Sequence, residues 1–78
     1  MSEARYFIIR LLSKNIEDPS RYLHVSKSGY GYGDTLDITA ATRFGSRGQA
    51  EYWMNAAKKN RFYKEKGYIF EILEAEHA

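Results

Sequence analysis

Five basic side chains fall within nine residues near the C-terminal end of the chain, and two aromatic residues lie among them. These residues are Lys58, Lys59, Arg61, Phe62, Tyr63, Lys64 and Lys66. Cationic side chains beside exposed aromatic rings can follow a phosphate backbone and stack on bases. The stretch therefore predicts a nucleic-acid-binding surface. A solvated helix end followed by a basic loop would also explain these residues, and the sequence leaves both interpretations open.

A glycine-spaced segment, residues 28–35, presents Tyr30 and Tyr32 between its glycines. Phosphate-binding loops open directly into a helix, whereas an extended segment follows here, and the lysine of such loops is missing. We interpret the segment either as a plain connection between strands or as an adaptable loop that offers two tyrosines to a partner. Together with Tyr6 and Tyr22, which we expect to be exposed, they form a predicted partner-binding set, because tyrosines are enriched at protein interfaces.

The predicted start of a helix, residues 43–48, combines Arg43 and Arg47 with two glycines and free backbone N–H groups. Such a helix start can bind an anion such as a phosphate. An ordinary capped helix with solvated arginines is the alternative interpretation. Ser46 is better explained as the helix cap than as a nucleophile, because its neighbours lack the spacing of a nucleophile elbow.

The remaining polar side chains form no recognisable catalytic or metal-binding arrangement. His24 and His77 are the only histidines, and they are not at metal-ligand spacing. The absence of cysteine excludes thiolate metal sites and cysteine nucleophiles, and it favours the cytoplasm. Charged residues interrupt the short N-terminal apolar run, so we expect neither a signal peptide nor a membrane span. We therefore expect a cytoplasmic, non-enzymatic protein without a cofactor, a metal or a membrane partner.

Residues 5–12 alternate in the period-two pattern of a β-strand, with Phe7 and Ile9 on the side that we expect to face the core. The other side carries Tyr6 and Ile8 and is more apolar than a solvated face needs to be. We expect another chain or the terminal segment to cover it. Such a cover, together with the thin core of a short chain, favours a homodimer.

A helix is predicted from the Ser46 and Gln49 pair, which fits a capping box. Its apolar stripe follows helical spacing and consists of Ala50, Trp53, Met54 and Ala57. The other elements are predicted as a turn over residues 15–20, strands over 21–27 and 36–39, a helix end near Asn60 in a left-handed cap, a loop over 61–67 and a strand over 68–74.

The chain is predicted to be a single domain over residues 1–78, because 78 residues lie at the lower end of what folds alone. The fold class is α+β, a small antiparallel sheet in the order β-β-β-α-β with one amphipathic helix packed on one face. The net charge of +2 is small, but residues 43–68 hold seven basic and two acidic side chains. The positive charge is therefore concentrated around the predicted helix and the loop that follows it.

A resemblance adds to this interpretation. The Ala-Thr-Arg-Phe step at residues 41–44, the Ser-Arg pair that opens the helix at residues 46–47, Ala50 and the closing strand resemble small proteins encoded by bacteriophages and prophages. The resemblance covers residues 36–74 and the opening strand. It implies an accessory factor without enzymatic activity that binds and blocks host defence machinery or sequesters a nucleotide signal.

We therefore predict a binding protein of phage type that inhibits a host factor by protein–protein contact through the tyrosine set. The first alternative is a nucleic-acid-binding module that uses the basic stretch. The second is a sponge for a small phosphorylated nucleotide, with Arg43 and Arg47 on the phosphate and the tyrosines on the base.

Overall fold

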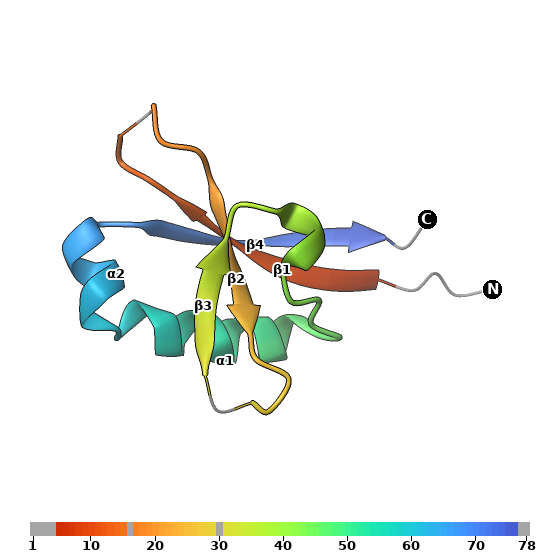
Figure 1. Cartoon of the computed structure of the whole chain (residues 1–78). Coiled ribbons are helices and arrows are strands. Elements are labelled where there is room, and N and C mark those ends of the chain that lie inside the picture. The colour runs from red at the N-terminus through yellow and green to blue at the C-terminus, as the bar shows by residue number, and fades with distance from the viewer. Residues whose placement is uncertain (1–4, 16, 30, 77–78) are drawn as a thin grey trace.

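The structure, a computed structural model, describes residues 5–15, 17–29 and 31–76. In chain order its elements are β1 (Arg5–Leu12), β2 (Arg21–Val25), β3 (Tyr32–Thr35), the 3-10 turn η1 (Ile38–Ala40), α1 (Arg47–Lys58), α2 (Arg61–Lys66) and β4 (Ile69–Glu76). The strands form an antiparallel sheet in the order β3-β2-β1-β4 (Figure 1). This arrangement confirms the predicted α+β fold with one main helix.

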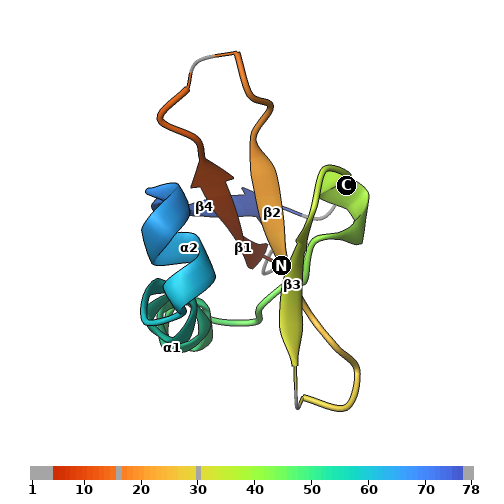
Figure 2. The same ribbon diagram turned by 60° about the vertical axis from the view of Figure 1, so that its left-hand side comes forward.

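The two longest strands, β1 and β4, pair along their whole length, from Arg5 opposite Glu76 to Leu12 opposite Ile69. Because side chains alternate along a strand, Ile9 and Leu11 lie on the face that α1 covers, and both are completely buried. Figure 2 shows α1 and α2 on one side of the sheet and η1 on the other. The predicted inward face of the first strand is therefore confirmed.

The start of α1 follows the capping prediction with one difference. The Ser46 hydroxyl accepts a hydrogen bond from the Gln49 N–H at 3.2 Å, as expected. The Gln49 side chain reaches one residue further back than a capping box requires, because its Oε1 accepts from the Gly45 N–H at 3.1 Å. The predicted stripe is confirmed by Ala50 and Ala57, which are fully buried against the core.

The prediction of a third strand over residues 36–39 is wrong. The strand comes earlier, at Tyr32–Thr35, within the segment that was predicted to be a loop. The next residues form η1, because Asp37 accepts hydrogen bonds from both the N–H and the hydroxyl of Thr39. A short polar side chain that bonds to the backbone two residues ahead competes with strand pairing.

The prediction of a loop over residues 61–67 is also wrong, because these residues form α2. Asn60 does not adopt a left-handed cap. It has an extended backbone, and its side chain accepts from the Phe62 N–H at 2.8 Å, which starts the second helix. Gly67 ends that helix with a φ of 70°, a conformation that favours glycine. The second predicted strand ends at Val25 rather than at residue 27, and the last extends over Ile69–Glu76.

Residues 41–44, which we call the seam, join the two halves of the sheet. Among the described residues, β1 and β2 pair at two positions near the end of β1. Beyond these positions the seam lies between the strands. Phe44 exchanges two backbone hydrogen bonds with Phe7 on β1, at 2.8 and 2.9 Å. Thr42 donates its N–H to the Leu23 carbonyl on β2, and its hydroxyl accepts from the Val25 N–H at 2.7 Å.

The outer face of β1 is partly covered by the chain itself. Ile8 on this face is only 4% exposed, and Tyr6 lies under the guanidinium of Arg43, 4.7 Å from the ring centroid. Ile8 is therefore buried without a partner chain, and cover of this face by another chain or by the terminal segment stays a prediction.

Candidate functional site

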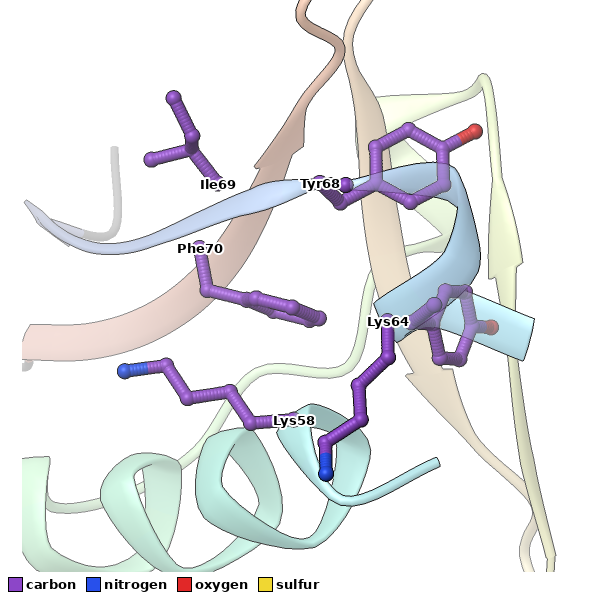
Figure 3. A pocket seen from close by; sticks show the side chains of 7 residues that line it. Lys58, Lys64, Tyr68, Ile69 and Phe70 are labelled. Carbon is purple, nitrogen blue, oxygen red and sulfur yellow. The ribbon is translucent and has the colours of Figure 1, made fainter. Parts of the chain in front are cut away.

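A cavity of about 300 Å³ lies where the end of α1, the helix α2 and the start of β4 meet. Figure 3 shows the side chains around it, with Lys58 and Lys64 on the helix side and Phe70 on the strand side. Its lining consists of Lys58, Tyr63, Lys64, Gly67, Tyr68, Ile69 and Phe70. Cationic and aromatic side chains thus meet here, together with the aliphatic Ile69.

Local sequence signals place the cavity walls. Lys58 is the last residue of α1. Asn60 caps the start of α2 two residues later, so Lys64 on α2 lies on the neighbouring wall of the cavity. Gly67 then turns the chain back into β4, which brings Phe70 opposite the helices. A side chain at Gly67 would be strained by its φ and would meet the Lys14 side chain, whose Cε lies 3.0 Å from an added Cβ.

The aromatic part of the lining is tied into the core. Tyr63 is 5% exposed and packs edge-on against Phe70, with ring centroids 6.1 Å apart. Tyr68 lies 6.0 Å from Tyr63 in a tilted contact. Tyr68 and Phe70 themselves are half-buried. Both rings are therefore held in place by packing and still expose part of their surface.

The cationic part of the lining has no internal partner. Neither the Lys58 nor the Lys64 ammonium forms a hydrogen bond or an ion pair with any residue that the structure describes, and no acidic side chain lines the cavity. The carbonyls of Ala56 and Ala57 at the end of α1 do not need these lysines, because the Lys59 N–H and the Tyr32 hydroxyl donate to them. Both ammonium groups are thus available to a bound anion.

A polar network fixes α2 against the sheet. The Tyr63 hydroxyl donates to Asp34 on β3 at 2.8 Å, and Arg21 on β2 donates to the other carboxylate oxygen of Asp34 at 2.8 Å. Burial, and after it the hydrogen bond to Asp34, raise the pKa of Tyr63 far above its usual value. The hydroxyl therefore remains a neutral donor at physiological pH, and the cavity wall is preorganised.

The basic stretch is divided between the cavity and the open surface. Lys58 and Lys64 line the cavity, whereas Lys59 and Arg61 are exposed and do not line it. Lys66 lies 5.6 Å from the centroid of the Phe62 ring, in a cation–π contact on the outer side of α2.

The exposure that we predicted for one aromatic residue of the basic stretch is wrong. We expected Tyr63 to be an exposed stacking residue, and it is buried instead, because it holds α2 on the core. Phe62 keeps the expected exposure, at 54%. Sequence reasoning assigned Tyr68 and Phe70 to a strand and did not connect them with the lysines, since a short helix and a glycine turn had to be recognised first.

The predicted tyrosine set does not form one exposed surface. Tyr32 is half-buried between Trp53 and Tyr63, and its hydroxyl bonds to α1. Tyr6 and Tyr22 are also half-buried. These three tyrosines are therefore less exposed than we expected, and their role in partner binding stays a prediction. Tyr30 lies outside the described residues.

The two arginines at the start of α1 do not converge. Arg43 lies over Tyr6, whereas Arg47 lies 5.5 Å from the centroid of the Phe7 ring. Tyr6 and Phe7 are neighbours in a strand, so their side chains point to opposite faces of the sheet. Arg43 and Arg47 are therefore separated by the sheet and do not form the single anion site that their spacing suggested.

Comparison of the chain with models of protein families, with curated proteins and with solved structures finds no match. Within the described ranges, no helix is long and apolar enough to cross a membrane.

Proposed function

We propose that the protein is a non-enzymatic binding protein that binds nucleic acid at the cavity between α1, α2 and β4. The observation that carries this proposal is the pair of unpartnered lysines, Lys58 and Lys64, on a cavity whose other side chains are mainly aromatic. Lysines attract phosphates through charge, and aromatic rings offer the faces on which bases stack.

The surroundings of the cavity extend the positive surface. Lys59 and Arg61 are exposed between the two lysines in the sequence, and Lys66 follows on the same short helix. Glu65 is the one acidic residue between positions 58 and 66. A chain with a net charge of only +2 can therefore present a local positive patch to a phosphate backbone.

The test is the salt dependence of binding to a fluorescent oligonucleotide, measured by anisotropy. Each phosphate contact with a single strand contributes a slope of about −0.7 to the plot of log K against log salt concentration. Replacing both lysines, in K58A/K64A, should make this slope shallower by about 1.4, twice that contribution, and should weaken binding at low salt.

The matched control is K27A/R43A, because each double variant takes the formal net charge from +2 to zero. Lys27 and Arg43 are exposed and lie outside the cavity lining. Equal losses in the two variants would mean that net charge alone drives binding. Binding that does not change with salt would contradict the proposal directly.

An inhibitor of a host protein, of the kind found among small phage proteins, is the second candidate. It is favoured by two apolar side chains, Leu36 before η1 and Ile38 within it, which are 54% and 50% exposed. A tagged pull-down from bacterial lysate, treated with nuclease, tests it. A discrete protein that is retained by the wild type and lost in L36S/I38S would support the candidate, and equal retention by both would contradict it.

A further inference from the structure

The size of the cavity limits what can enter it. Its volume of about 300 Å³ lies at the lower end of the range for small-molecule pockets, roughly 300 to 1,000 Å³. This is room for one group of nucleoside size. A base inside a duplex could reach such a cavity only by leaving the stack.

The rings that line the cavity are suited to a flat ligand. Phe70 projects from β4 toward the stems of Lys58 and Lys64 (Figure 3). Its position is fixed by an edge-on contact with Tyr63, which itself hydrogen-bonds to Asp34. A fixed, partly exposed ring can stack on any base without a large loss of side-chain entropy on binding.

The two lysines enter from the side opposite the strand and come from different helices. An ammonium group is a compact charge with three donors on a flexible stem. Each lysine can therefore reach a different phosphate next to a base that lies on Phe70. No described carboxylate lines the cavity to oppose an anion there.

We propose that this cavity binds one unstacked base of a single-stranded nucleic acid, with the base against Phe70 and the adjoining phosphates at Lys58 and Lys64. The inference rests on the proposed function and narrows it to single strands. It predicts that the bases, and not only the phosphates, contribute to affinity.

The experiment compares four probes by anisotropy or by competition: a labelled single strand, its duplex, a single strand of equal length without bases, and a mononucleotide. The base-free strand keeps the phosphates and loses the stacking partner. We expect it to bind about tenfold more weakly than the normal strand, since one stacked base contributes about that factor. The duplex should also bind more weakly.

The variant F70L removes the ring and keeps an apolar side chain. It should reduce binding of the normal strand to the level of the base-free strand and leave binding of the base-free strand unchanged. The control Y52L removes an aromatic residue of α1 that is 68% exposed and does not line the cavity. It should change the binding of neither the normal strand nor the base-free strand. If F70L does not fold, as judged by circular dichroism, Y68L replaces it.

The outcomes separate the two proposals. Equal binding of normal and base-free strands, still dependent on Lys58 and Lys64, would overturn the base site and leave the proposed function standing. A mononucleotide that binds as tightly as the strand would overturn the assignment to a strand. If no probe binds, both proposals fail.

Discussion

Tyr63 on α2 donates a hydrogen bond to Asp34 on β3 across 29 positions of the sequence, with 2.8 Å between the two oxygens. β3 lies at one edge of the sheet and the β4 wall of the cavity lies at the other. This contact therefore ties the short helix to the far strand, while the Tyr63 ring supports Phe70 on the near one. A six-residue helix is marginal by itself, so its position depends on such tertiary contacts.

Removal of this hydrogen bond should destabilise the protein. Y63F keeps the ring and leaves Asp34 bonded to Arg21. We expect the free energy of unfolding in urea to fall by about 1.5 to 3 kcal/mol, the range for hydrogen bonds to charged groups. Y22F is the control, because the Tyr22 hydroxyl has no hydrogen-bond partner among the described residues and should change stability little. A similar loss in both variants would contradict the role of the Asp34 contact.

The same residue should make stability fall at high pH. The pKa of Tyr63 is raised in the folded state, by burial first and by Asp34 second. Above about pH 10 the unfolded chain releases this proton while the folded chain keeps it, so the contribution is complete below pH 10 and decreases above it. Urea unfolding at several pH values should show a steeper decline above pH 10 in the wild type than in Y63F. Parallel curves would contradict this assignment.

Gly67 should not tolerate a side chain. G67A places a Cβ on a backbone with a φ of 70° and 3.0 Å from the Lys14 side chain. We expect a loss of about 1 to 2 kcal/mol, the cost of the left-handed conformation. The control G48A adds a Cβ within α1, where the nearest atom is 3.9 Å away, and should stabilise the protein by about 0.5 to 1 kcal/mol. Thermal unfolding of both variants would show whether their melting temperatures move in opposite directions.

The hydroxyl of Thr42 should contribute more to the stability of the protein than the shape of the Thr42 side chain does. T42V keeps the volume of the side chain but removes the acceptor of the Val25 N–H, a bond of 2.7 Å. An unsatisfied backbone donor costs about 1 to 3 kcal/mol, so urea unfolding should show a loss in that range. T42S retains the hydroxyl and should recover most of the stability that T42V loses. A T42S variant as unstable as T42V would indicate that the methyl group carries the effect.

The elements that the sequence predicted depend on local patterns. The alternation around Ile9 and the pair of Ser46 and Gln49 act over a few residues, so they were visible without the fold. The sequence did not predict the helix α2, because six residues are too few to show a helical pattern of apolar side chains. The burial of this helix also depends on the long-range hydrogen bond between Tyr63 and Asp34. η1 was missed because Asp37 bonds to Thr39 in a segment with the composition of a strand.

The candidate site was predictable only in part. The charges of Lys58 and Lys64 indicated a possible phosphate contact from composition alone. Their pairing with Phe70 requires the turn at Gly67 and the register of β4 on β1, which brings Phe70 opposite Leu11. The sequence left open a shared anion site at Arg43 and Arg47, because their spacing cannot show that the two side chains lie against Tyr6 and Phe7, on opposite faces of the sheet.

The seam limits where this chain could be lengthened or cut. Connections between a strand and a helix usually accept inserted residues and new termini, because their backbone is exposed. Here residues 42 and 44 bond to two different strands, so an insertion between them would have to break pairing with β1 or with β2. Circular permutation at residues 41–44 should therefore fail, whereas new termini within the exposed residues 17–19 of the β1–β2 connection should be accepted.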